Sequence, residues 1–188
     1  MNGMKISKAF AIAICVVIVV LAVTVYSATS NILIEGTVTD SKVFDGPVKV
    51  TVRELTIKPG EELPLHYHPG HTFIVVKSGT LTLEDGCGEE QKLTPGQGAE
   101  EMNGRVHRGK NVDATDVLVY DIFITSPGKP LTSNIPANER RCGPPKDVDE
   151  CRNQGWRKFN HLRSFTNQGQ CIDFVRHMPR TLAMFQRN

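Results

Sequence analysis

The stretch GEELPLHYHPGHT, residues 60–72, contains three histidines, of which His66 and His68 are separated by one residue. On a β-strand, residues i and i+2 project from the same face, about 6–7 Å apart along the strand. Two imidazoles placed in this way can bind one ion. His107 follows after a further hairpin and is the candidate for a third ligand. Three imidazoles on one side of an ion leave positions open for water or substrate.

Outward from this stretch, residues 32–124 show short apolar or alternating segments between turn signals. The strand-like segments are residues 48–57, 73–76, 81–84 and 117–124. The turn signals are Pro59-Gly60, Ser78-Gly79, Asp85-Gly86, Pro95-Gly96 and Pro127-Gly128. Short strands at this spacing predict an all-β sandwich or barrel.

Two motifs in this region resemble those of the cupin family. The first, G-x5-H-x-H-x3-E-x6-G, is matched by Gly60, His66, His68 and Gly79, with Thr72 at the glutamate position. The second, G-x5-P-x-G-x2-H-x3-N, is matched by Gly96, Gly104, His107 and Asn111, with Met102 at the proline position. The resemblance implies an all-β fold with a single cupin jelly-roll barrel. It also implies that His66, His68 and His107 point into this barrel as metal ligands.

Thr72 is the departure that matters for the metal site. The family glutamate is usually the fourth ligand, and a threonine hydroxyl is short and neutral. A three-histidine site leaves the ion its full charge, which weakens binding and strengthens its action as a Lewis acid. His71 adjoins this position, either as an exposed loop residue or, through a bulge, as a fourth ligand. Glu100 and Glu101 are expected to be solvated, although one could act as an acid or base.

The metal is a divalent ion whose identity the sequence does not decide. Imidazole ligands suit iron, zinc, nickel and copper, and manganese remains a candidate. A net charge of +2, without a long basic run, gives no electrostatic basis for nucleic-acid binding. We therefore expect a small-molecule ligand. The resemblance also leaves a homodimer open, because cupins often dimerise through strand exchange.

The N-terminal region has the pattern of an export signal. Lys5 and Lys8 precede an apolar run at residues 9–25, and small residues follow it. This arrangement predicts a signal peptide or an uncleaved transmembrane helix that anchors the chain in the membrane. We therefore expect the remainder to be extracytoplasmic, either secreted or membrane-anchored.

Cysteine usage agrees with export. Four cysteines follow the apolar run, and an even number in an exported chain suggests two disulfides, with three possible connectivities. They are Cys87, Cys142, Cys151 and Cys171. The tail also resembles a small cysteine-bounded segment found at the ends of some exported microbial proteins. This resemblance implies a Cys151–Cys171 bridge, which leaves Cys87 with Cys142.

The predicted organisation has four parts. They are a signal peptide or anchor at residues 1–30, a cupin barrel at 31–126, a Pro-rich linker at 127–149 and a cysteine-containing extension at 150–188. Two functions fit this organisation. One is a metal-dependent oxidoreductase or isomerase that acts on a small molecule. The other is a non-catalytic module that binds a small molecule or sugar at the cell surface. Fold alone does not choose between them.

Overall fold

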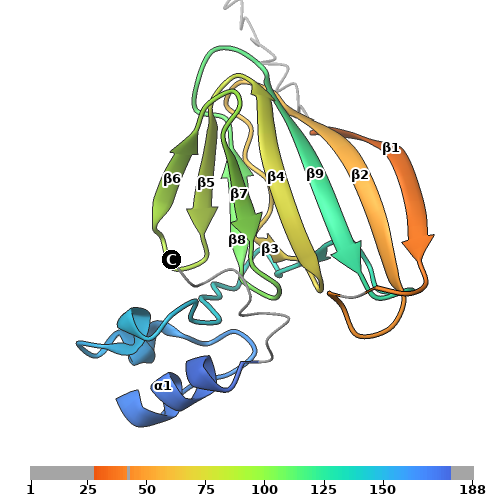
Figure 1. Cartoon of the computed structure of the whole chain (residues 1–188). Coiled ribbons are helices and arrows are strands. Elements are labelled where there is room, and N and C mark those ends of the chain that lie inside the picture. Colours follow the sequence, from red (N-terminus) through yellow and green to blue (C-terminus); the bar gives the residue numbers. More distant parts are fainter. Residues whose placement is uncertain (1–27, 42, 179–188) are drawn as a thin grey trace, which may run out of the picture.

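The computed structural model describes residues 28–41 and 43–178. Within these residues the chain is mostly β-structure, followed by a short helical segment (Figure 1). The strands are β1 (Thr29–Val38), β2 (Val48–Ile57), β3 (His66–Tyr67), β4 (His71–Ser78), β5 (Leu81–Asp85), β6 (Glu90–Leu93), β7 (Gly98–Glu101), β8 (His107–Lys110), β9 (Val117–Thr125) and β10 (Ser133–Asn134). The helices are η1 (Asp149–Cys151), η2 (Gly155–Lys158) and α1 (Gln168–Arg176).

The strands form two antiparallel five-stranded sheets. One has the order β1-β2-β9-β4-β7, and the other has the order β10-β3-β8-β5-β6. Strands that are distant in sequence are neighbours in both sheets, as a jelly roll requires. The β part of the predicted fold class is therefore confirmed. The helix predicted at residues 9–25 lies outside the described residues. Among the residues that are described, no helix is long and apolar enough to cross a bilayer.

The core lies between the two sheets. Its buried apolar side chains are Leu55, Ile57, Ile74, Val76, Leu81, Leu93, Val117 and Val119. Gly79 allows the chain to turn tightly from β4 into β5. Its φ angle is +75°, and a Cβ at this position would lie 2.5 Å from the carbonyl oxygen of Asp116. Both the backbone conformation and the close approach therefore require glycine at this motif position.

The C-terminal extension is attached to one end of the barrel, below β5, β6 and β8 in Figure 1. The structure contains the disulfides Cys87–Cys142 and Cys151–Cys171, the pairing that the sequence resemblance implies. A small apolar cluster surrounds them and includes Phe159 and Phe165. The disulfides supplement a cluster that is too small to form a core of its own.

The segment predicted as a Pro-rich linker also lies against the barrel. Within it, β10 pairs with β3, so that Asn134 lies opposite His66. Ile135 and Cys142 of the same segment are buried. This stretch consequently continues the second sheet and leads the chain to the end of the barrel at which the histidines lie.

Candidate metal centre

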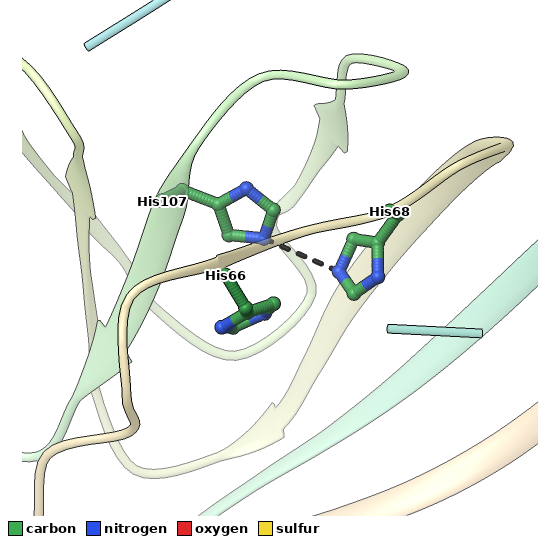
Figure 2. Close-up of side chains that lie close together, drawn as sticks. All are labelled: His66, His68 and His107. Carbon is green, nitrogen blue, oxygen red and sulfur yellow. Dashed lines mark hydrogen bonds between the residues drawn. The ribbon is translucent and has the colours of Figure 1, made fainter. Parts of the chain in front are cut away.

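Two of the three histidines lie on neighbouring strands of the second sheet, and the third directly follows one of these strands. His66 lies on β3 and His107 opens β8, and these two residues are directly paired across the strands. His68 follows two residues after His66 and projects toward the same side. All three side chains are buried. Figure 2 shows the three rings turned toward one another.

The ring nitrogens converge on one point. The Nε2 atoms of His68 and His107 are 3.2 Å apart. Taking one nitrogen from each of the three histidines, all lie within 4.8 Å of one another. The structure thus brings together the three residues that the sequence predicts as ligands, in a group that could hold a metal ion.

The backbone fixes which nitrogen of each ring is free. Each Nδ1 lies within hydrogen-bond distance of a carbonyl oxygen. The oxygens, in the order of the histidines along the chain, belong to Pro64, Leu131 and Arg105, at 2.8, 2.7 and 2.9 Å. A carbonyl oxygen can only accept, so in the neutral ring Nδ1 carries the proton. The three Nε2 lone pairs are left to face the common point, as metal-ligating histidines require.

A carboxylate also faces this point. Glu101 Oε2 lies 3.0 Å from His68 Nε2, and Oε1 lies 3.3 Å from His107 Nε2. The expectation that Glu101 is solvated is wrong, because the residue is only 9% exposed. The reason is the register of β7, which pairs with β4 so that Glu101 lies opposite the inward-facing Thr72.

Burial and mutual charge set the protonation of these groups. Burial, reinforced by the neighbouring imidazoles, lowers the pKa of His66 to about 3. Burial alone would raise the pKa of Glu101, but the imidazoles of His107 and His68 hold it well below its usual range. Burial disfavours the charged form of His107, but Glu101 outweighs this and raises its pKa. The site thus favours an ionised Glu101 carboxylate beside a positively charged His107 imidazole.

His71 does not join this group. It lies on β4 with its ring 5.5 Å from that of Phe44, and its Nδ1 is 3.4 Å from Glu100. It is also buried, so it is not an exposed loop residue. Thr72 faces the opposite side, toward the interior. Its hydroxyl is buried and has no hydrogen-bond partner among the described residues.

Two charged residues inside the barrel were not predicted from the sequence. Arg53 on β2 and Asp121 on β9 form a buried ion pair, with nitrogen–oxygen distances of 2.6 and 2.7 Å. Burial raises the pKa of Asp121 to about 6, although Arg53 opposes the shift. Together with His66, His68 and Glu101, these two side chains line a small internal space of about 20 Å³.

A larger cavity opens beside the histidines. Its volume is about 320 Å³, and all but one of its lining residues belong to the barrel. His107 and Glu101 are among these, and Lys146, from the segment predicted as a linker, completes the lining. Organic ligands commonly occupy cavities of about 300–1,000 Å³. The cavity therefore offers a small molecule access to the histidine site.

The donor set fits a divalent metal ion. Ligands that each lie about 2.1 Å from a shared ion are roughly 3.0–3.4 Å from one another in octahedral or tetrahedral arrangements. The separations among His68 Nε2, His107 Nε2 and the Glu101 oxygens, from 3.0 to 3.3 Å, agree with this range. Imidazole and carboxylate ligands are compatible with several transition metals, so the donor set does not select one.

Comparison with known proteins agrees with the motifs. Residues 53–123 match the family model "Cupin domain". No functionally curated protein matches the sequence. Among solved structures, the chain is similar to an uncharacterized conserved protein with a double-stranded beta-helix domain from Klebsiella pneumoniae. That pair shares 20% identity with a TM-score of 0.46, over 57% of this chain and 78% of the other.

Two further structures give comparable values. A cupin domain from Bordetella pertussis is 26% identical with a TM-score of 0.41, over 53% of this chain and 94% of that one. The polyketide cyclase RemF from Streptomyces resistomycificus is 18% identical with a TM-score of 0.42. The match to RemF covers 48% of this chain and 63% of that chain.

The family match spans the strands that carry His66, His68, Glu101 and His107. Both sequence motifs, at residues 60–79 and 96–111, lie wholly within it, and the two antiparallel sheets have the expected jelly-roll arrangement. Residues 53–123 of the chain thus match the cupin family.

Proposed function

We propose that this chain is an exported cupin metalloprotein that oxidises or isomerises a small molecule. The observation that carries the proposal is the orientation of the three imidazoles. Each Nδ1 is held by a backbone carbonyl, and each Nε2 lone pair is aimed at one buried point. Lone pairs that face one another repel unless a proton or a metal cation lies between them, and three such nitrogens beside a carboxylate form a donor set suited to a metal ion.

The residues around the site would have different roles. His66, His68 and His107 would hold the ion, which would supply Lewis acidity and open positions for a substrate or water. The candidate metals are iron, zinc, manganese, nickel and copper. The 320 Å³ cavity is the proposed substrate pocket, because His107 and Glu101 line both the cavity and the site. Its size restricts the substrate to a small molecule.

Export is part of the proposal. The apolar run at residues 9–25 with its preceding lysines supports secretion or anchoring in the membrane. The two disulfides support it independently, because disulfides persist in oxidising compartments and are rare in the cytosol. In that compartment the available metals would help to decide which ion the site holds.

A non-catalytic binding module is the second candidate. The observation that favours it is the 20 Å³ internal space beside His66 and His68, which is too small for an organic molecule. A ligand would then contact the site only from the larger cavity, on the side of His107. Such a module would bind its small molecule or sugar without converting it.

The first experiment measures metal content in the purified full chain after exposure to each candidate ion. We expect about one ion per chain, lost in His66→Ala and in His107→Ala. The matched control is His177→Ala, because His177 is exposed on the C-terminal extension. If the wild-type chain binds none of the ions, the metalloprotein proposal is wrong and the binding module remains. Screening the metal-loaded chain against small acids and sugars then separates turnover from binding alone.

A further inference from the structure

The carboxylate of this site comes from a different strand than in the sequence motif. The motif places glutamate at position 72, on β4, where this chain has threonine. Glu101 lies on the adjacent strand β7, and its Cα is paired with that of Thr72. Side chains of directly paired residues project from the same face of the sheet, with Cβ atoms about 5 Å apart. A glutamate at either position is thus directed toward the same part of the barrel.

The surroundings of Thr72 and Glu101 show how a carboxylate from β7 can take the place of one from β4. Thr72 is fully buried and short, and its hydroxyl makes no hydrogen bond within the described part of the chain. The longer side chain of Glu101 extends past it to the histidines. Both Glu101 oxygens are used there, one against His68 Nε2 at 3.0 Å and one against His107 Nε2 at 3.3 Å.

Charge accounts for the location of this carboxylate. Moving an ionised carboxylate from water into a buried site is costly unless opposite charge or hydrogen-bond donors surround it. Among the described residues, the partners within ion-pair range of Glu101 are the Nε2 atoms of His68 and His107. Both rings use Nδ1 for a backbone carbonyl. A divalent cation between them would satisfy the carboxylate and the lone pairs together.

We propose that Glu101 is the anionic ligand of the metal centre, substituting across the β4–β7 strand pair for the glutamate that Thr72 replaces. This inference rests on the proposed metal function and adds a fourth protein ligand to it. The carboxylate neutralises half of the charge of a divalent ion. The site is then a three-histidine, one-carboxylate centre in which the carboxylate comes from a variable position inside the second sequence motif.

The test uses Co²⁺ as the probe, because its visible absorption reports the ligands around it. The affinity and spectrum of the full chain are compared with those of Glu101→Gln, which keeps the shape and removes the charge. We expect the affinity to fall by at least tenfold and the spectrum to change. The matched control is Glu100→Gln on the same strand, since Glu100 borders the cavity but contacts His71 rather than the three ligand histidines. Its affinity and spectrum should equal those of the wild type.

A rescue variant tests the exchange between strands. Thr72→Glu combined with Glu101→Gln returns the carboxylate to the motif position. We expect Co²⁺ affinity within about threefold of the wild type. Circular dichroism and thermal unfolding of the metal-free variants establish that each one folds. If Glu101→Gln does not fold, Glu101→Asp provides a second measurement, since it withdraws the charge by one methylene and should give weaker binding.

The possible results separate the two proposals. Unchanged Co²⁺ affinity and spectrum in Glu101→Gln, together with loss of metal in His66→Ala, overturn the role of Glu101 and leave the histidine site. Absence of Co²⁺ binding by the wild type, and of every other ion offered, overturns the metal function itself. A tenfold loss in Glu101→Gln that Thr72→Glu repairs establishes the inference.

Discussion

Asn111 directly follows β8, and its side chain bonds to three backbone groups, one at the end of β2 and two in the loop before β9. Its Nδ2 donates to the carbonyl oxygens of Ile57 and Thr115, both at 2.8 Å. Its Oδ1 accepts from the backbone nitrogen of Asp113 at 3.1 Å. Asn111 is only 1% exposed, so water cannot replace these bonds. The second-motif asparagine therefore has a structural role, four residues after the ligand His107.

Asn111→Asp should destabilise the chain without removing the metal. The carboxylate keeps the size of the amide but faces two carbonyl oxygens to which it cannot donate. We expect a loss of about 2–4 kcal/mol in the free energy of unfolding, measured with urea. The control is Asn134→Asp, at an exposed position on β10. Loss of metal from a folded Asn111→Asp chain would contradict the structural role.

Sequence spacing predicts the histidines but not the carboxylate. His66 and His68 share a face because a strand repeats every two residues, and His107 lies at a fixed place in the second motif. Glu101 reaches the site only through the register between β4 and β7. That pairing is long-range, and no local pattern encodes it. A pair of adjacent glutamates is also typical of a solvated surface, and the pairing of the strand is not known from the sequence.

At the scale of the strands, both faces of the first sheet are partly apolar. The alternation of Val50 and Val52 predicts a buried face, yet both are only half-buried. The interior positions of the same strand are the odd-numbered Thr51, Arg53 and Leu55, which alternate with Val50 and Val52. Alternation gives the period of a strand but not which face lies inside. For this reason Arg53, and Asp121 opposite it on β9, could not be assigned to the barrel interior from the sequence.

Arg105 connects the barrel to the C-terminal extension through buried charges. Its guanidinium donates to Asp85 at 2.6 Å, to Glu150 at 2.8 and 2.9 Å, and to the carbonyl oxygen of Pro144 at 2.8 Å. Burial would raise the pKa of both carboxyls, but Arg105 and backbone N–H donors lower the pKa of Asp85 and of Glu150. These carboxylates thus stabilise the folded chain only while they are ionised.

The sign of this contribution predicts the effect of acid. A carboxyl with a lowered native pKa contributes its full stability above its unfolded pKa, at about 4, and loses it as the pH falls through the native value. Arg105→Met should cost about 3 kcal/mol at pH 7, because it leaves buried carboxylates unpaired. The difference in unfolding free energy from the wild type should become smaller below a pH of about 4, where the unpaired carboxyls become protonated.

Urea unfolding of both chains at a series of pH values measures this difference. Arg152→Met is the control, because Arg152 forms its ion pair with Asp149 on the surface, where the two side chains are 60% and 79% exposed. That variant should follow the wild type at every pH. If the difference in unfolding free energy between Arg105→Met and the wild type stays constant down to pH ~3, these carboxyls are not linked to Arg105.

At the scale of the whole molecule, the segment after the barrel adds one side chain to the wall of the proposed substrate pocket. This segment, predicted as a linker, supplies Lys146, and the other lining residues, His107 among them, belong to the barrel. Its backbone is attached beside that ligand, since the nitrogen of Val106 donates to the carbonyl oxygen of Gly143 at 2.9 Å. The sequence predicts the separate parts, but the place at which the segment docks depends on long-range contacts that no motif encodes.

Loss of the Cys87–Cys142 disulfide should therefore loosen the segment after the barrel more than it loosens the barrel. It joins residues that are 55 positions apart and fixes the extension to the turn between β5 and β6. Closing a loop of that length contributes about 4 kcal/mol in the chain-entropy account. In Cys87→Ala/Cys142→Ala, we expect proteolysis to cut within residues 126–178 before it cuts the barrel. Metal should stay bound, because all four proposed ligands belong to the barrel strands or to the loop between β3 and β4.

Cys151→Ala/Cys171→Ala is the informative comparison, because that disulfide lies wholly within the extension and spans 20 positions. This variant should loosen the apolar cluster around Phe159 and Phe165 while the first disulfide still holds the chain beside the β5–β6 turn. Small-molecule binding in the cavity should thus be weakened more by loss of Cys87–Cys142 than by loss of Cys151–Cys171. Equal losses in both variants would mean that the internal order of the extension, rather than its attachment, shapes the pocket. Loss of metal in the first variant would show instead that docking also holds the histidines, through the carbonyl oxygen of Leu131 that orients His68.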